Sequence, residues 1–409
     1  MEIVHRQCGG LDVHAKTVVA CARHVDAADR ITREVRTFGT TTAELLALAD
    51  WLQAQGCTQV VMESTGVYWK PVWHVLEDTC TLVLANAQHV RNIPGRKSDA
   101  NDAVWLADLL AHGLIRGSFV PPAPVQALRD LTRTRKQLVR EGARHLLRIQ
   151  KVLEDANVKL REVVSDLRGT SARAILKALV AGETDPVRLV ACTTGQLRAT
   201  PAALQAALEG HVTAHHRYLL RLHLVQLDAL DAAVRDVEAR IGATLGPLAV
   251  AVERLTTMPG VSQTLARVIV AEIGTDMTRF PTAGHLVSWA GLCPRLHESA
   301  GKRLSTRTRP SAPWLKTNLV QGAWAAIRAR DRYFHAQFLR LKSRRGPKKA
   351  IVAVAASMLT AAYHMLRNEV PYRDLGADHF DRRDKTKLTN RLLRRLKELG
   401  VEVEVRPAA

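Results

Sequence analysis

The spacing of hydrophobic and polar positions predicts a mixed α/β segment at the start of the chain. Short apolar runs at 7–13 and 17–24 flank a polar turn at 14–16, and residues 31–38 alternate between apolar and polar. Alternation is typical of strands, and a short polar connection is typical of a hairpin. The pattern therefore predicts three antiparallel strands.

Three helices and two further strands are predicted after these strands. In order, they are a helix that begins at Thr41 or Thr42 and ends at Gly56, a strand at 58–62, a helix at 66–76, a strand at 81–85 and a helix at 99–112 capped by Ser98. Because crossovers between parallel strands are right-handed, both later strands are expected to run parallel to the first. This order is that of ribonuclease H-like folds, and it predicts such a domain at 1–120.

A proline-rich segment at 121–124 separates this domain from a region with a helical pattern. Within that region one helix has the spacing of a coiled-coil seam, with apolar residues at Leu227, Leu230, Val234, Val237 and Ile241. The clean repeat covers only about two heptads, so a helical hairpin packed within one chain is the alternative. Either arrangement makes residues 125–254 a helical arm suited to dimerisation or to holding a partner.

The pattern changes again after Leu255. The turn Met258-Pro259-Gly260-Val261 precedes an apolar helix and resembles half of a helix-hairpin-helix element, in which backbone N–H groups point at a phosphate. We predict a small, mainly α domain at 255–375 and a basic helical tail at 376–409.

Residues 350–366 contain no Asp, Glu, Lys or Arg, which raises the question of a membrane span. The stretch has 17 residues and is rich in alanine, whereas a span needs roughly 20 strongly apolar residues, so we interpret it as a buried helix. The N-terminus lacks the apolar core of a signal peptide, and the six cysteines include no C-x-x-C pair. We therefore expect a cytoplasmic protein without a membrane partner, a disulfide framework or a zinc ribbon.

Charge indicates a polyanionic partner. The chain has 59 Lys and Arg against 39 Asp and Glu, a net charge of +20, and 47% hydrophobic residues provide ample core. Between residues 295 and 350, 15 basic residues face two acids, so +13 of the excess lies in 56 residues. A stretch of this length that carries almost only positive charge favours contact with phosphate groups. It is not expected for small-metabolite chemistry alone.

Four acids in the first domain stand out by their placement. Asp12 ends the first strand, Glu63 follows the fourth, and Asp99 and Asp102 share a face in the first turn of a helix. If they converge, their charges repel unless cations neutralise them, and oxygen ligands suit two Mg²⁺ or Mn²⁺ ions that act on a phosphodiester. Aspartates at a helix N-terminus are also common for reasons of the helix dipole alone. Asp108, two turns further along, is expected to face solvent.

Several motifs resemble one family in the same order along the chain. The motifs are Gly10-Leu11-Asp12-Val13-His14, Glu63-Ser64-Thr65-Gly66-Val67-Tyr68, Arg96-Lys97-Ser98-Asp99-Ala100-Asn101-Asp102-Ala103, Met258-Pro259-Gly260-Val261 and Trp289-Ala290-Gly291-Leu292-Cys293-Pro294-Arg295. They resemble the Asp-Glu-Asp-Asp transposases of the insertion-sequence "one-ten" family, relatives of the Piv invertase. The similarity covers roughly residues 8–375.

The resemblance implies a ribonuclease H-like domain related to Holliday-junction resolvases, a coiled-coil middle and a C-terminal domain with a catalytic serine. It implies that a non-coding bridge RNA selects donor and target DNA, and that the protein works as a homo-oligomer, a dimer or tetramer. By position the serine is Ser299. Ala300 stands where the family commonly has glycine, so Ser305 and Ser311 remain alternatives.

Basic side chains around this serine are expected to hold nucleic acid: Arg295, Lys302, Arg303, Arg307, Arg309, Lys316, Arg344, Arg345, Lys348 and Lys349. The sequence thus predicts a metal-dependent, RNA-guided DNA recombinase whose serine attacks a DNA phosphate. The alternatives are a junction-resolving nuclease that uses metal-activated water, and a non-catalytic nucleic-acid-binding regulator.

Overall fold

The computed structural model describes residues 2–63, 66–86, 90, 93, 102–195, 199–294, 297–305, 307–308, 313–383 and 385–403. The chain folds into two compact units, Met1–Val120 and Pro121–Ala409.

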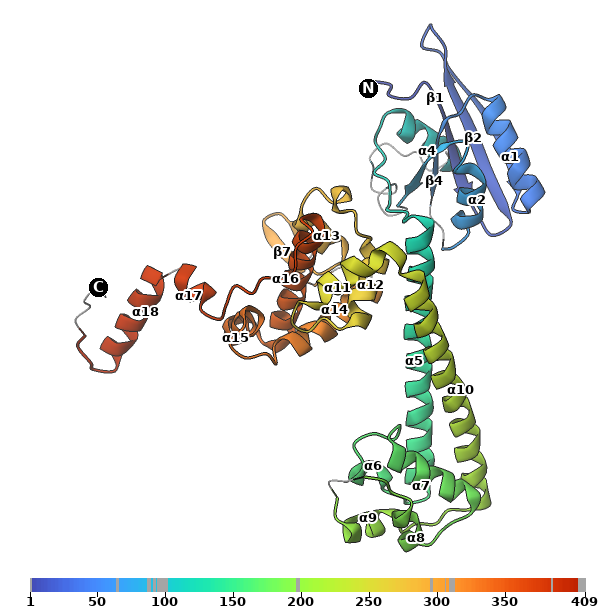
Figure 1. Cartoon of the computed structure of the whole chain (residues 1–409). Coiled ribbons are helices and arrows are strands. Elements are labelled where there is room, and N and C mark those ends of the chain that lie inside the picture. The colour runs from blue at the N-terminus through green and yellow to red at the C-terminus, as the bar shows by residue number, and fades with distance from the viewer. Residues whose placement is uncertain are drawn as a thin grey trace. The chain divides into compact units, whose positions relative to one another are not determined.

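The first unit is built on a five-stranded sheet (Figure 1). Its strands are β1 (Gln7–Val13), β2 (Thr17–Val25), β3 (Ile31–Gly39), β4 (Gln59–Glu63) and β5 (Thr81–Ala85), in the spatial order β3-β2-β1-β4-β5. The first three strands pair antiparallel, while β4 pairs parallel with β1 and β5 pairs parallel with β4. The predicted pairing is confirmed.

Helices cover both faces of this sheet (Figure 1). They are α1 (Thr42–Ala54), α2 (Trp69–Leu76) and α4 (Asp102–Ala111). The predicted cap of α1 is confirmed, because the Thr41 side chain accepts a hydrogen bond from the Glu44 backbone N–H. Residues of α1 and α2 pack with Leu11 and Met62 on one face, and α4 packs with Cys8 on the other.

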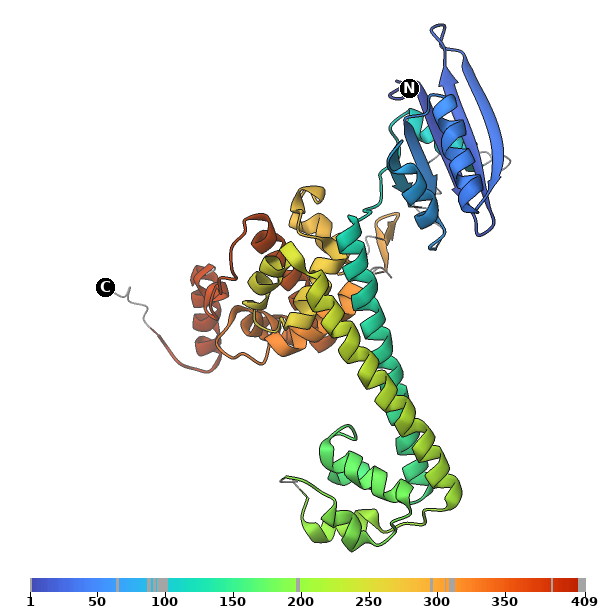
Figure 2. The same cartoon turned by 45° about the vertical axis from the view of Figure 1, so that its right-hand side comes forward.

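The second unit begins with a long antiparallel helical hairpin, α5 (Ala123–Asp155) and α10 (Ala214–Thr244), shown in Figure 2. The predicted seam of α10 packs on α5 of the same chain, with Leu227 and Ile241 buried. The alternative of an intrachain hairpin is therefore correct. The distal end of the hairpin packs against α6 (Leu160–Val163), α7 (Thr170–Ala181), α8 (Pro186–Ala191) and α9 (Pro201–Leu208).

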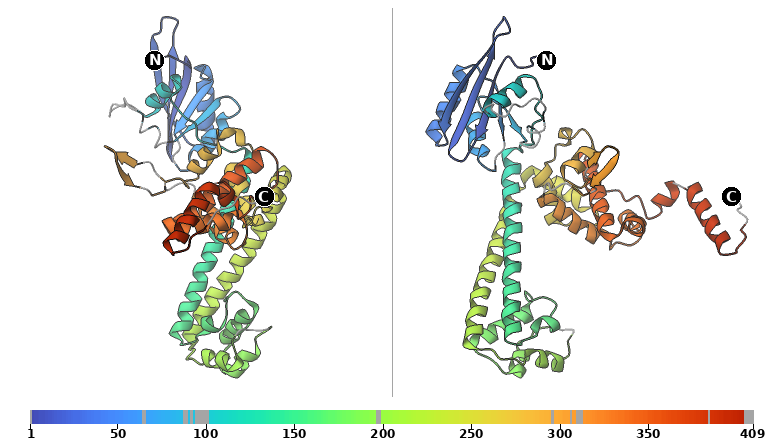
Figure 3. Two further views of the ribbon diagram at one scale, coloured as in Figure 1. Left: turned by 90° about the vertical axis from the view of Figure 1, so that its left-hand side faces the viewer. Right: turned by 180° about the vertical axis from the view of Figure 1, so that it is seen from behind.

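A helical bundle follows the hairpin. Its elements are η1 (Gly246–Leu248), α11 (Ala249–Thr256), α12 (Gln263–Ile273), η2 (Met277–Arg279), α13 (Ala283–Trp289), α14 (Pro313–Ala326), α15 (Tyr333–Arg345) and α16 (Pro347–Arg367), with the strands β6 (His297–Ser299) and β7 (Lys302–Ser305). Figure 3 shows β6 and β7 as a separate two-stranded hairpin. The tail forms α17 (His379–Arg383) and α18 (Lys385–Glu398).

Helix α16 is the core helix of this bundle, as its apolar sequence predicted. Val354, Met358 and Leu359 are fully buried against the other helices. In the described part of the chain α16 is also the one helix long and apolar enough to cross a membrane, but 56% of its most apolar window is buried. A core helix meets the same criteria of length and composition.

The turn before α12 has a packing function. Gly260 adopts a positive φ of 80°, and a Cβ built there lies 2.3 Å from the carbonyl oxygen of Gly322 in α14. Only glycine permits both this conformation and this close approach. Helices α11 and α12 do pack as a helix–turn–helix pair, but packing alone accounts for the glycine, and contact with a phosphate stays a prediction.

Asp108 does not face solvent as a free carboxylate, and that expectation was wrong. Its Oδ1 accepts hydrogen bonds from Arg23 Nε at 2.8 Å and from Arg33 Nη2 at 2.9 Å. The Arg23 side chain is 1% exposed. A buried guanidinium needs a carboxylate partner, and α4 supplies it across the sheet face from β2.

Replacing Asp108 with alanine should lower the free energy of unfolding by about 3 kcal/mol, because Arg23 would remain buried without a countercharge. Urea unfolding followed by circular dichroism measures this change. Asp29→Asn is the matched control, since asparagine tolerates the positive φ of 59° at this position and the exposed Arg6–Asp29 pair should contribute less than about 1 kcal/mol. Equal losses in both variants would contradict the structural role of the buried pair.

Candidate active site

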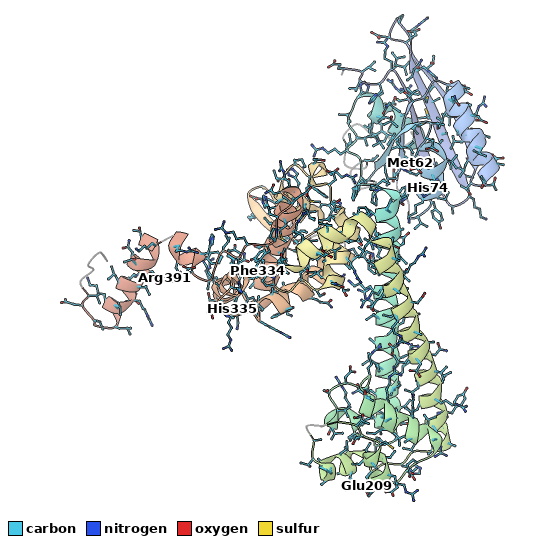
Figure 4. The ribbon with its side chains drawn as sticks, in the orientation of Figure 1. Met62, His74, Glu209, Phe334, His335 and Arg391 are labelled. Carbon is cyan, nitrogen blue, oxygen red and sulfur yellow. The ribbon has the colours of Figure 1, made fainter. Side chains whose placement is uncertain are left out.

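Asp12 and Glu63 lie at the carboxyl ends of two adjacent parallel strands. The β1–β4 register pairs Leu11 with Met62, so the next residue on each strand is one of the two acids. Side chains alternate along a strand, and Asp12 therefore shares the face of Cys8, which packs against α4. Met62, labelled in Figure 4, belongs to the opposite face and packs with α1 and α2.

Asp102 reaches the same edge because of the direction of α4. The Cys8 thiol lies 3.4 Å from the carbonyl oxygen of Ala107, whereas Gly10 lies against Ala103 one turn earlier. Helix α4 therefore runs antiparallel to β1, and its first residue, Asp102, lies toward the end of β1 that carries Asp12.

Gly10 makes this arrangement possible. A Cβ at Gly10 would lie 2.2 Å from the carbonyl oxygen of Ala103 and 2.6 Å from the backbone nitrogen of Ala107. No side chain fits there, and the bare backbone lets α4 pack directly on β1. Gly10, two residues before Asp12, thus sets how closely the start of α4 approaches the end of β1.

His14 is a neighbour of the site to which the sequence interpretation gave no role. Its Nε2 lies 3.1 Å from Oδ2 of Asp12, whose side chain is 18% exposed. The sequence did contain a signal for this contact, which is the two-residue spacing of Asp12 and His14. Side chains two residues apart on an extended segment lie on the same face. A protonated His14 would neutralise part of the local negative charge.

The acids suit a divalent cation in their chemistry. Asp12, Glu63 and Asp102 offer only carboxylate oxygens, which are the ligands that Mg²⁺ and Mn²⁺ prefer. Among the described residues, however, no three His, Cys, Asp or Glu side chains are gathered closely enough to hold a metal ion. Asp99 lies outside the described residues, so the convergence of all four acids stays a prediction.

Ser299 lies at the tip of the β6–β7 hairpin, where it pairs with Lys302. The two turn residues, Ala300 and Gly301, have positive φ values of 47° and 73°. Two-residue hairpin turns favour such values, but alanine adopts them at a cost of about 1–2 kcal/mol. Ala300 therefore adopts a turn conformation that glycine would adopt at lower cost, and this strain lies next to Ser299 in the chain.

Of the two alternative serines, Ser305 lies among the described residues and Ser311 does not. The Ser305 hydroxyl accepts a hydrogen bond from the Arg307 backbone N–H at 3.2 Å, which is ordinary turn chemistry. Ser311 lies outside the described residues, as does the side chain of Ser299.

The predicted basic residues fall into two described groups. Lys302 and Arg307 are exposed on and beside the hairpin, while the ammonium of Lys316 in α14 donates to Thr308 Oγ1 at 2.6 Å. Burial lowers the pKa of Lys316. The second group surrounds the exposed α15–α16 turn and comprises Arg344, Arg345, Lys348 and Lys349. Arg295, Arg309 and the side chain of Arg303 lie outside the described residues.

The four side chains of the second group lie at two helix ends whose dipoles act on positive charge in opposite ways. Arg344 and Arg345 at the end of α15 are favoured by the partial negative charge there. Lys348 and Lys349 lie in the first turn of α16, where cations are disfavoured. A bound anion would remove this conflict, since helix N-termini and lysines both attract phosphates.

Comparisons with known proteins indicate one class of protein, the transposases. Residues 9–158 match a family model of IS110-type DEDD transposases, described as a transposase, and residues 252–339 match the transposase IS116/IS110/IS902 family. A probable family 20 transposase of Pseudomonas aeruginosa is 27% identical over 326 residues, which are 77% of this chain and 85% of the relative.

Two further relatives match shorter segments. A putative transposase, y4pF/y4sB, of Sinorhizobium fredii is 30% identical over 30% of this chain and 32% of its own length. An uncharacterized 43.6 kDa protein of insertion element IS110 from Streptomyces coelicolor is 33% identical over 36% of each chain.

Proposed function

This chain belongs to the IS110 family of transposases, and on that premise we propose that it is a metal-dependent DNA recombinase with Asp12, Glu63, Asp99 and Asp102 as its catalytic acids. Transposases cut and rejoin DNA, so DNA is the substrate. The observation that supports the proposal is that Asp12 and Glu63 end adjacent parallel strands and that α4 begins, with Asp102, toward the same end of β1. The sheet order β3-β2-β1-β4-β5 supports a ribonuclease H-like fold for this unit.

The acids would hold one or two Mg²⁺ or Mn²⁺ ions, which supply Lewis-acid stabilisation of a phosphodiester when bound. Each carboxylate contributes negative charge and oxygen ligands. His14 orients Asp12 through their 3.1 Å contact and limits its free rotation. Gly10 keeps α4, and with it Asp102, close to the strand end.

Ser299 is the proposed nucleophile. Its oxygen forms a bond to a DNA phosphorus while the bond from that phosphorus to a deoxyribose oxygen breaks. A general base receives the serine proton, and a general acid donates a proton to the leaving deoxyribose oxygen. The released deoxyribose hydroxyl, or the equivalent hydroxyl of another strand, reverses the step. Lys302, which pairs with Ser299 across the hairpin, and the exposed Arg307 are proposed to stabilise charge on the phosphate.

Sequence choice is proposed to come from a bridge RNA, as the family resemblance implies, with the protein contacting backbones and helix shape. Exposed cations at the hairpin and at the α15–α16 turn support the binding of such polyanions. We propose a homo-oligomer, a dimer or tetramer, as the family resemblance implies, located in the cytoplasm.

Removing divalent metal tests this proposal. The purified protein with its co-purifying RNA is incubated with supercoiled plasmid that carries the element's ends, with Mg²⁺ or with excess EDTA. We expect nicked, linear or recombined DNA only with Mg²⁺, and recovery when Mg²⁺ is restored. Binding without any change of topology in Mg²⁺ would support a regulator instead, and cleavage in EDTA would contradict the metal-dependent site.

A further inference from the structure

A basic cavity lies in the second unit, between α5, α10, α12 and α14, and it contains none of the proposed catalytic residues. Its volume is about 210 Å³. Four cationic side chains line it, Arg135, Lys136 and Arg140 from α5 and Arg267 from α12. Gln321 of α14 adds an amide to the lining.

Three of these cations have no carboxylate partner. Arg135 donates to Glu238 at 2.7 Å and is neutralised. The nearby carboxylate of Glu272 is held by Arg133 through two hydrogen bonds of 2.8 Å. Across the described residues, no ion pair joins Lys136, Arg140 or Arg267 to an acid. Lys136 and Arg140 lie over the Trp314 ring, but this aromatic contact supplies no full negative charge, so the cavity retains an excess of positive charge.

Hydrogen bonding in the cavity is also incomplete. The Nε of Arg267 is buried and has no hydrogen-bond partner, and its Nη2 reaches only Gln263 Oε1 at 3.3 Å. Lys136 donates to a neutral acceptor, Thr317 Oγ1, at 2.7 Å. Burial and the charge of Arg140 lower the pKa of Lys136 to about 8. Each of these features would be relieved by an anion with several acceptor oxygens.

We propose that this cavity binds a phosphate group through Lys136, Arg140 and Arg267. A tetrahedral oxyanion offers acceptors in several directions, which suits an ammonium and two guanidinium groups that approach from α5 and α12. The Gln321 amide supplies a further donor. The same chemistry is found in a phosphodiester of a bound nucleic acid and in a free phosphorylated small molecule. The inference does not depend on the acids or on Ser299.

Binding to the full-length protein is measured by calorimetry with inorganic phosphate, with a nucleoside 5′-monophosphate and with a short single-stranded oligonucleotide. The cavity variants are Arg267→Gln and Gln321→Glu, and the matched control is Arg235→Gln, an exposed arginine of α10 outside the cavity. Hydrogen bonds to charged groups make a loss of about tenfold or more in affinity the expected result for both cavity variants. The control should stay within about twofold at fixed ionic strength.

The outcomes separate the sources of the phosphate. Weaker binding of the monophosphate or inorganic phosphate identifies a small-molecule site, while weaker binding of the oligonucleotide alone identifies a backbone phosphate. Gln321 is exposed, so Gln321→Glu should fold normally even if Arg267→Gln does not, and thermal melting checks both. The proposal is overturned if no probe binds the native chain, or if the well-folded cavity variants bind every probe as the control does.

Discussion

Replacing Asp12 with asparagine is expected to reduce DNA cleavage and strand exchange by about a thousandfold or more while leaving the fold intact. The amide keeps the shape of the side chain and loses its negative charge. Metal ions contribute several kcal/mol to transition-state stabilisation, and about 4 kcal/mol corresponds to about a thousandfold in rate. Single-turnover cleavage of the supercoiled plasmid in Mg²⁺ measures the loss.

The melting temperature of Asp12→Asn distinguishes a loss of catalysis from a loss of folding. Asp12 lies on the strand next to the one that carries Glu63, and removing one of two neighbouring like charges relieves repulsion. The melting temperature of Asp12→Asn should therefore equal or exceed that of the native chain. Asp78→Asn, on an exposed turn of the same unit, is the matched control and should cleave normally. Full activity in Asp12→Asn would remove Asp12 from the site.

Replacing Ser299 with alanine is expected to abolish the covalent protein–DNA adduct. The hydroxyl oxygen is the atom that would bond to phosphorus, and alanine has no nucleophile to replace it. The adduct is detected as a shifted band on denaturing gels after the reaction is quenched. Because the substitution removes a single hydroxyl group and leaves the Cβ in place, expression and melting should be unchanged.

Ser305→Ala is the matched control for this experiment. Its hydroxyl accepts a hydrogen bond from the Arg307 backbone N–H just after the hairpin, so its loss should perturb this turn slightly and leave the adduct in place. If the adduct persists in Ser299→Ala and disappears in Ser305→Ala, the nucleophile is Ser305. Cleavage without an adduct in the native chain would instead favour a nuclease that uses water.

Much of the first unit could be predicted from the sequence because its strands are marked by local patterns. The apolar runs at β1 and β4 and the alternation at β3 indicated where these strands lie and which residues end them. Once β1 and β4 are taken as parallel neighbours, Asp12 and Glu63 must lie at one edge. The cap at Thr41 and the buried helix α16 were equally local signals.

Other features depend on contacts between residues far apart in the chain. Nothing near Asp108 indicates that Arg23, 85 residues earlier, is buried and needs its carboxylate. The seam of α10 has the same spacing whether its partner is another chain or α5. Gly260 fits a phosphate-binding turn by sequence, but its neighbour across the bundle, Gly322, accounts for it by packing.

The sequence by itself therefore determined the elements, the strand ends that carry Asp12 and Glu63, the concentration of positive charge and the family. Periodicity and charge are local properties, so they can be read along one chain. Only the tertiary structure decided that the long helices pair with each other, that α4 docks on Gly10, and that Lys136 and Arg267 line one cavity. These outcomes are set by close packing and by burial of charge, which depend on distances in space and not on distances along the sequence.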